Sequence, residues 1–384
     1  MSEKDRREAL LRLALTPGVG PTRIATLVDA FGDADAVLRA PVARLRQVDG
    51  VGPRLAERIA SAAGAAAGER ARETLRRLER IGAEVLTPGD GRYPDAFSTV
   101  SQPPFVVFAL GDFELLHRPA VAVVGTRTPT SYGVSVTIRI ASDLAEAGYG
   151  VVSGMAAGID AAGHAASLDA GVGSIGVLGQ GIDRVYPAEN RDLFTRMRRE
   201  GLLLSEFAPG EPPMAGHFPR RNRLIAALGA GVLVVEMSLK SGAQHTVNFA
   251  LELGREVFAV PGPIGSPVSE GTNQLIREGA CLVTGAADIL EALGEVSARP
   301  GRTAPDSPAS RPASPAPVAP TPIPVVEGDE KQVVATLRTG PRHVDEIVAE
   351  SGLPAGRILS LLLGLELRGL VRSLPGKRFD LAVG

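Results

Sequence analysis

Small residues follow several short apolar runs of the chain, in a pattern that is typical of a phosphate-binding surface. The groups are Gly125-Thr126-Arg127, Ser153-Gly154, Gly179-Gln180-Gly181 and Ser241-Gly242. Glycine lets backbone N–H groups approach an anion closely, while hydroxyl groups and helix N-termini add further favourable partners. A single glycine could equally mark a structural turn, so the prediction rests on the coincidence of several groups.

An arginine cluster is the sharpest of the candidate motifs, because three arginines lie within four residues. It reads Phe218-Pro219-Arg220-Arg221-Asn222-Arg223-Leu224-Ile225. Arginine pairs with phosphate through two parallel hydrogen bonds, and Phe218 could stack on an exposed base. A solvated charge run is the ordinary alternative, but apolar residues flank Arg221 and Arg223 on both sides. We expect the cluster to lie just before a helix that runs through Ala227, and Arg127 to face the same groove.

The chain offers no recognisable catalytic group. We find no nucleophile with a neighbouring base, no metal-ligand spacing, no Walker loop and no dinucleotide fingerprint. We therefore expect a protein that is not an enzyme and that holds no cofactor or metal. Asp160 and His164 are expected to share a helix face and to fix the Gly154–Gly158 loop by hydrogen bonds. Glu236, which ends an apolar run, is expected to order a neighbouring loop.

Apolar strands that alternate with helices must position these groups. The strands are expected at 121–124, 150–153, 174–178, 231–235 and 256–260. Such alternation predicts the α/β class, with a doubly wound, Rossmann-like parallel sheet. Ligands bind such a sheet beyond the carboxyl ends of its strands, which is where the small residues lie.

Composition divides the 384 residues into four regions. Residues 1–87 read as helices with Gly-Pro turns, and 88–297 hold the alternating strands and helices. Residues 298–326 are rich in Pro, Ala and Ser, so we expect an extended linker there. Residues 327–384 have the order of a winged helix, with helices followed by two strands that form a wing.

A short repeat stands out in the first region. Gly18-Val-Gly-Pro21 is echoed by Gly50-Val-Gly-Pro53, and each places a proline where a helix would start. The pattern resembles a SAM-like helix-hairpin-helix, in which N–H groups of the turn can hold a DNA phosphate. Hairpins that only connect packed helices are slightly favoured, because the same turns occur in domains that touch no DNA.

Charge and cysteine content limit the possible binding partners and the possible cellular compartment. The net charge is −2, so a nucleic-acid site must come from local arginine clustering. Residues 328–384 carry eight basic and seven acidic side chains, a net charge of +1, so this unit could contact protein instead of DNA. No signal peptide or membrane-spanning run is evident, and Cys281 is the single cysteine. We expect a cytoplasmic protein with no membrane insertion and a buried thiol.

An ordered set of motifs runs between residues 90 and 290. It includes Val121-Ala-Val-Val-Gly-Thr-Arg127, Val151-Val-Ser-Gly-Met-Ala-Ala-Gly-Ile-Asp160, Phe218-Pro-Arg-Arg-Asn-Arg223 and Phe258-Ala-Val-Pro-Gly262. This set resembles the DNA-processing protein A (DprA, also called Smf) family. The resemblance implies an extended Rossmann-like domain, an N-terminal helical domain and a C-terminal winged-helix-like domain. Met155 and Gln180 replace residues that are more often Leu and Cys or Thr in the family.

The resemblance also implies a function. Family members bind single-stranded DNA, protect incoming DNA and load the RecA recombinase onto it in natural transformation, and they form homodimers. The candidate DNA-binding residues are Gly125, Thr126, Arg127, Ser153, Gly154, Gly181, Phe218, Arg221, Asn222, Arg223, Ser241 and Gly242. We expect Arg127→Ala and Arg223→Ala each to weaken single-strand binding while the fold stays intact.

Two alternatives stay open. A nucleotide-processing hydrolase, similar to the lysine-decarboxylase-like phosphoribohydrolases, would share the Rossmann-like fold, although its Pro-Gly-Gly-x-Gly-Thr loop is absent. A partner-binding scaffold whose loops hold only a small phosphate ligand would show the same glycine-rich strand ends. Release of free base from nucleoside monophosphates would indicate the hydrolase, and failure to bind poly-dT would indicate the scaffold.

Overall fold

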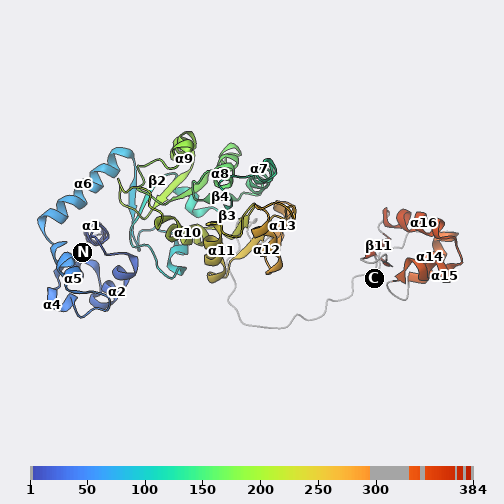
Figure 1. The fold of residues 1–384 in the computed structure, drawn as a ribbon, viewed down its shortest axis with the longest axis horizontal. Coiled ribbons are helices and arrows are strands. Elements are labelled where there is room, and N and C mark those ends of the chain that lie inside the picture. Colours follow the sequence, from blue (N-terminus) through green and yellow to red (C-terminus); the bar gives the residue numbers. More distant parts are fainter. Residues whose placement is uncertain (1–2, 295–327, 338–341, 368–369, 375–377, 382–384) are drawn as a thin grey trace. The chain divides into compact units, whose positions relative to one another are not determined.

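The computed structural model describes residues 3–294, 328–337, 342–367, 370–374 and 378–381 (Figure 1). The chain divides into two compact units, residues 1–303 and 304–384. The expected linker at 298–326 lies outside the described residues. No helix in the described ranges is long and apolar enough to cross a bilayer.

The first unit begins with six helices. They are α1 (Glu3–Ala14), α2 (Pro21–Phe31), α3 (Ala34–Arg39), α4 (Val42–Leu45), α5 (Pro53–Ser61) and α6 (Ala65–Ile81). Pro21 and Pro53 open α2 and α5, as the repeat predicted, because proline has the backbone angle of the first helical turn and needs no N–H partner there. One apolar cluster joins these helices to the sheet through Phe108, Leu178 and Leu203. The helical segment therefore packs on the sheet as part of one unit.

A nine-stranded sheet forms the centre of the first unit. Its strands are β1 (Glu84–Leu86), β2 (Val107–Gly111), β3 (Ala120–Val124), β4 (Gly150–Ser153), β5 (Ser174–Leu178), β6 (Leu202–Ser205), β7 (Gly231–Val234), β8 (Glu256–Ala259) and β9 (Cys281–Leu282). Their order is β1-β2-β6-β5-β4-β3-β7-β8-β9. The predicted Rossmann-like α/β class is confirmed, although β2 pairs antiparallel with β1 and β6 at one edge. The sheet begins at β1, slightly before the expected start of this region at residue 88.

Helices cover both faces of this sheet. They are α7 (Ser131–Glu146), α8 (Ile159–Asp169), α9 (Arg191–Glu200), α10 (His217–Leu228), α11 (Ala243–Glu252), α12 (Glu270–Arg277) and α13 (Ala286–Ala292), with 3₁₀ turns η1 (Asp95–Thr99), η2 (Phe113–His117) and η3 (Ala188–Asn190). Side chains alternate across a strand, so Val121 and Val123 of β3 join the core with α7, α8 and α13. Ala122 and Val124 join the opposite core with α10, α11 and α12.

The strand order reverses at β3. From β3 the chain builds toward β4, β5 and β6 on one side and toward β7, β8 and β9 on the other. The loops after β3 and β7 must therefore leave the sheet in opposite directions and open a crevice between them. Cys281 on the edge strand β9 is half-buried, so the expectation of a buried thiol is wrong.

The second unit has winged-helix order, as predicted. Its elements are α14 (Asp329–Leu337), β10 (Arg342–His343), α15 (Val344–Ser351), α16 (Ala355–Leu367), β11 (Val371–Leu374) and β12 (Arg378–Leu381). β11 and β12 pair antiparallel as the wing, and β10 adds a third strand. Leu337, Ile347 and Leu362 fill its small core.

Candidate nucleic-acid interface

Two adjoining cavities lie at the carboxyl ends of the parallel strands. The first, of about 310 Å³, is bounded by the loop after β3, the start of α10 and the Ser241–Ala243 segment. The second, of about 270 Å³, is bounded by the 154–157 loop, Tyr186 and Pro187. Both are lined by Arg127, Thr128, Ala156, Phe218 and Arg221. The first cavity occupies the crevice where the strand order reverses, which is the usual ligand position in such sheets.

A set of partly or fully exposed residues borders the first cavity, and three of them also line the second. We call Arg127, Thr128, Phe218, Ser241 and Gly242 the rim. Arg127 is exposed and has no ion pair among the described residues, and its guanidinium carbon lies 5.7 Å from the centre of the Phe218 ring. The Phe218 ring in turn lies 5.6 Å from that of Tyr186. The rim therefore combines an available cation with an aromatic surface.

The loop after β3 is fixed by Glu236. The backbone N–H of Thr126 donates to the Glu236 carbonyl at 2.7 Å. The Glu236 carboxylate accepts from the N–H of Thr130 at 2.9 Å and from its hydroxyl at 2.5 Å. Thr130 is the N-cap of α7, and its Oγ1 accepts from the N–H of Gly133. The expectation that Glu236 orders a neighbouring loop is confirmed.

The 154–158 loop is fixed by α8, as predicted. The Asp160 carboxylate accepts from the N–H groups of Gly154 at 3.0 Å and Ala156 at 3.4 Å. His164 Nε2 accepts from the N–H of Met155 at 3.3 Å, so its Nδ1 carries the proton and donates to Ser174 Oγ at 2.8 Å. The Ser174 hydroxyl donates onward to a carbonyl of β4. The loop backbone is thus held by a chain of buried hydrogen bonds.

Burial sets the charge of the groups beneath the rim. It lowers the pKa of His164 to about 3, with a further contribution from the Arg221 charge, so the imidazole is neutral. Burial raises the pKa of Asp160, although the Arg221 charge and the loop N–H donors oppose that shift. Burial also lowers the pKa of Arg221 to about 10, which leaves the guanidinium charged at neutral pH. A fixed positive charge therefore lies at the floor of both cavities.

The arginine cluster lies within α10 and not before it, contrary to expectation. Pro219 stands in the first turn of the helix, where the missing N–H has no consequence. Arg221 is buried and donates through Nη1 to the carbonyls of Gly154, at 2.7 Å, and Val177. A side chain at position 154 would collide with that guanidinium, so Arg221 would have to shift to make room for it.

Arg223 points elsewhere. Its two terminal nitrogens each lie 2.6 Å from an oxygen of Glu206, and one also donates to the Gln102 carbonyl at 2.8 Å. Both side chains of this pair are buried, and Arg223 lines neither cavity. The expectation that Arg223→Ala leaves the fold intact therefore changes, because the substitution would strand a buried carboxylate.

Other candidate residues support the surface from below or lie away from it. The Ser153 hydroxyl donates to the Val123 carbonyl inside the sheet. Asn222 donates to the Gly242 carbonyl at 3.3 Å and so ties α10 to the turn before α11. Gly181 is buried, donates to the Glu211 carbonyl and lines neither cavity. Gly125 and Thr126 line the first cavity.

Sequence reasoning missed residues on the far side of the second cavity. Tyr186 lines that cavity, and the side-chain amide of Asn190 donates to the carbonyls of Met155 and Ala156 at 3.0 and 3.1 Å. Neither residue is among the candidates inferred from the sequence, because nothing in their spacing indicated contact with the 154–158 loop. Among the described residues, no group of three His, Cys, Asp or Glu side chains could hold a metal ion.

Comparison with known proteins follows the same division of the chain. A family model described as DNA recombination-mediator protein A matches residues 84–294. The chain belongs to this family. A DprA winged helix domain model matches residues 310–377, and a SAM-like helix-hairpin-helix tandem model matches residues 9–65. The resemblance to DprA/Smf proteins is thereby confirmed.

Individual DprA proteins are similar over long stretches. Protein Smf of Synechocystis is 34% identical over 389 residues, which cover 94% of this chain and 96% of the relative. The structure of DNA processing protein A from Streptococcus pneumoniae superposes with a TM-score of 0.65 at 33% identity, over 73% of this chain and 95% of that one. A structure that describes the single-stranded DNA binding mode of the Helicobacter pylori protein gives a TM-score of 0.52 at 31% identity, over 56% of this chain and 97% of that one.

Proposed function

We propose that this DprA family member binds single-stranded DNA along the rim. The observation that carries the proposal is the exposed Arg127 guanidinium beside the Phe218 ring, above two adjoining cavities at the strand-order reversal. The described binding mode of the H. pylori relative supports the choice of ligand.

Each part of the rim suits one part of a nucleotide. Arg127 and the Thr128 hydroxyl can hold a phosphate. Phe218 and Tyr186 offer ring faces on which bases stack, and stacking requires bases that are not paired in a duplex. The buried Arg221 charge adds a favourable potential that needs no rearrangement when the strand arrives.

Arg127→Ala tests the proposal directly. We expect about tenfold weaker binding of a fluorescent oligothymidylate and a salt-dependence slope lower by about 0.7, because one phosphate contact is lost. The matched control is Arg118→Ala, which removes the same charge from an exposed arginine just before the opposite end of β3. Unchanged affinity and salt slope for Arg127→Ala would overturn the site.

We also propose that the protein is not an enzyme. Asp160 lines the first cavity and shares α8 with His164, but both side chains are buried and engaged by the loop backbone. We expect no release of free base from nucleoside monophosphates under conditions where the oligothymidylate binds. Base release that disappears in Asp160→Asn would favour a hydrolase instead.

Family membership supports the remaining proposals. We infer that the protein is cytoplasmic, protects incoming single strands in natural transformation and loads RecA onto them. RecA filament assembly on strands that a single-strand-binding protein already covers should accelerate when this protein is added, and equal rates would refute the loading role. The family resemblance also supports a homodimer, which sedimentation equilibrium would detect.

A further inference from the structure

A second basic hollow lies on the N-terminal helices. It measures about 530 Å³, opens between the two glycine hairpins and is lined by Gly18, Arg23, Gly50, Gly52, Pro53, Arg54, Leu55 and Arg58. Three of these side chains are arginines, and no described residue of the lining is acidic. The hollow therefore carries a positive charge that the chain as a whole, at −2, does not.

The two hairpins are built alike and contact each other. Gly18 and Gly50 take corresponding positions and have positive φ angles of 86° and 71°, which favour glycine. Arg58 of α5 reaches across and donates to the Pro17 carbonyl of the first hairpin at 2.8 Å. Arg23 donates to the Gly18 carbonyl at 3.0 Å. Arg23 and Arg58 are thus held beside the hollow by backbone carbonyls, which do not neutralise their charge.

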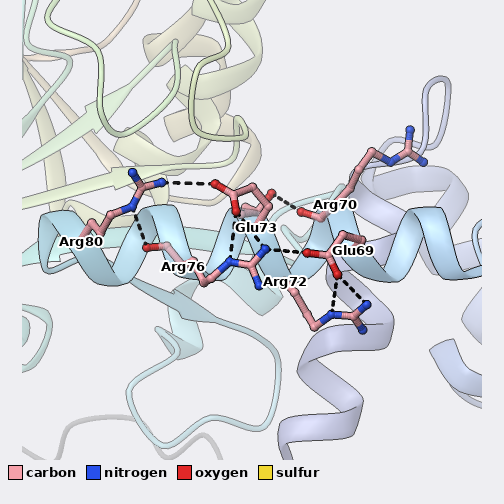
Figure 2. Close-up of polar contacts among 7 residues, drawn as sticks. Glu69, Arg70, Arg72, Glu73, Arg76 and Arg80 are labelled. Carbon is pink, nitrogen blue, oxygen red and sulfur yellow. Dashed lines mark hydrogen bonds and ion pairs between the residues drawn. The ribbon is translucent and has the colours of Figure 1, made fainter.

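A contrast within the same helical segment shows that this charge is unusual. On α6, Arg72, Arg76 and Arg80 each pair with Glu69 or Glu73, and the pairs form a ladder along the exposed helix face (Figure 2). The hollow's Arg23, Arg54 and Arg58 have no ion pair among the described residues. A polyanion therefore gains more from the hollow than from the more arginine-rich helix beside it.

A further cavity lies between the hollow and the start of α10. Gly18 also lines an intervening cavity of about 470 Å³ between the N-terminal helices and the sheet. The opposite wall of that cavity includes His217 and Arg220, which flank the Phe218 and Arg221 of the rim cavities on α10. His217 stacks on Phe207 with ring centres 3.9 Å apart. This cavity shares Gly18 with the hollow, whereas it has no lining residue in common with the rim cavities and meets them only through neighbouring residues at the start of α10.

We propose that a single strand bound on the rim continues around α10 into the hairpin hollow, where Arg23, Arg54 and Arg58 bind its phosphates. The inference rests on the proposed rim function and extends it. No aromatic side chain lines the hollow in the described structure, so contact there is to the backbone and independent of sequence. The rim anchors the strand, and the hollow makes binding depend on strand length.

The test compares two oligothymidylates, of about six and about 25 nucleotides, whose affinities are measured by anisotropy over a salt series. The wild type should bind the long strand more tightly and with a steeper salt dependence. In Arg23→Ala/Arg54→Ala/Arg58→Ala, affinity for the long strand should fall at least about tenfold and its slope by about 2, since three phosphate contacts are lost. Affinity for the short strand should not change.

The control removes three arginines from the ladder, as Arg72→Ala/Arg76→Ala/Arg80→Ala, and should leave both affinities unchanged. Two further variants guard against disturbance of the hairpins. Arg54 makes no side-chain hydrogen bond in the described structure, so Arg54→Glu alone should weaken long-strand binding in a fully folded protein. The triple replacement by lysine should restore most of the affinity.

The outcomes separate the two proposals. A wild type that binds neither strand would refute the rim function. If the wild type binds both strands, and Arg54→Glu and the alanine triple variant match its long-strand affinity and salt slope, the role of the hollow alone is refuted. An alanine triple variant that loses binding to a duplex but keeps its binding to the long single strand would also overturn the inference, because the hollow would then bind paired DNA.

Discussion

The rim and the groups beneath it use arginine in opposite ways. Arg127 on the rim is exposed and has no carboxylate partner among the described residues. Arg221 and Arg223, both on α10, are buried and donate to backbone carbonyls or to Glu206. We call Asp160, His164, Arg221, Arg223 and Glu206 the buried network. The comparison teaches that an arginine's accessibility, and not its presence in a basic motif, decides whether it binds a ligand or supports the surface that does.

Arg223→Ala should show the largest effect of any single change at this surface. Removing the guanidinium leaves the buried Glu206 carboxylate without its bidentate partner, so the free energy of unfolding should fall by about 3–5 kcal/mol. Urea denaturation measures this fall in the free energy of unfolding. The double variant Arg223→Met/Glu206→Leu should recover much of the loss, since it removes both charges. If Arg223→Ala lost binding at unchanged stability, Arg223 would belong with the rim.

Phe218→Leu should have the opposite effect to Arg223→Ala, because it should weaken DNA binding and leave the stability almost unchanged. Loss of the stacking surface should weaken oligothymidylate binding about tenfold or more, with only a small change in stability because the ring is half-buried. Phe113→Leu is the matched control, because Phe113 is also half-buried and lies beneath an arginine, Arg92, at 4.6 Å. Equal binding by the two variants would contradict a stacking role.

His164→Gln probes the network through pH. The folded imidazole stays neutral down to about pH 3, whereas the unfolded one takes up a proton below its ordinary pKa of 6.5. Acidification below pH 6.5 therefore destabilises the wild type through this group by up to about 1.4 kcal/mol per pH unit. The raised pKa of Asp160 acts in the opposite sense, because the folded carboxyl takes up its proton at higher pH.

In urea denaturation measured between about pH 3 and 6.5, His164→Gln should lose the contribution of His164 to the change of stability with pH. His245→Gln, at an exposed position of α11, should keep the wild-type slope. Identical slopes for wild type and His164→Gln would show that the imidazole is not held neutral by burial.

Arg72→Ala should have the smallest effect. Its partner Glu69 is exposed on the outer face of α6, where water competes for both charges (Figure 2). We expect a urea midpoint within error of the wild type and no change in DNA affinity. A clear loss of stability would show that the ladder acts as a network and would weaken the distinction between exposed and buried arginines.

Much of the fold could be predicted because its signals are local. The apolar runs of β3, β4 and β5 end at small residues, those of β7 and β8 end at Glu236 and Pro261, and each became a buried parallel strand. β1 and β9 are only three and two residues long, too short for periodicity to reveal. The antiparallel edge also depends on pairings between β2 and residues far along the chain.

The site was predicted less completely, for physical reasons. Asp160 and His164 are four residues apart on one helix, so their joint hold on the loop could be inferred from spacing. The partner of Arg223 is Glu206, which precedes α10 across a loop, and no spacing rule links the two. The direction of an arginine on a helix depends on such distant partners.

One helix, α10, carries both kinds of residue. Phe218 borders the cavities, and Arg223, less than two helical turns further along, forms the ion pair with Glu206. Selection for ligand affinity and selection for folding therefore act on different positions of the same short segment. Substitutions at the rim can therefore change which ligands are bound, while the buried residues keep α10 in its position on the sheet. Divergence in binding can accordingly proceed without passing through misfolded intermediates.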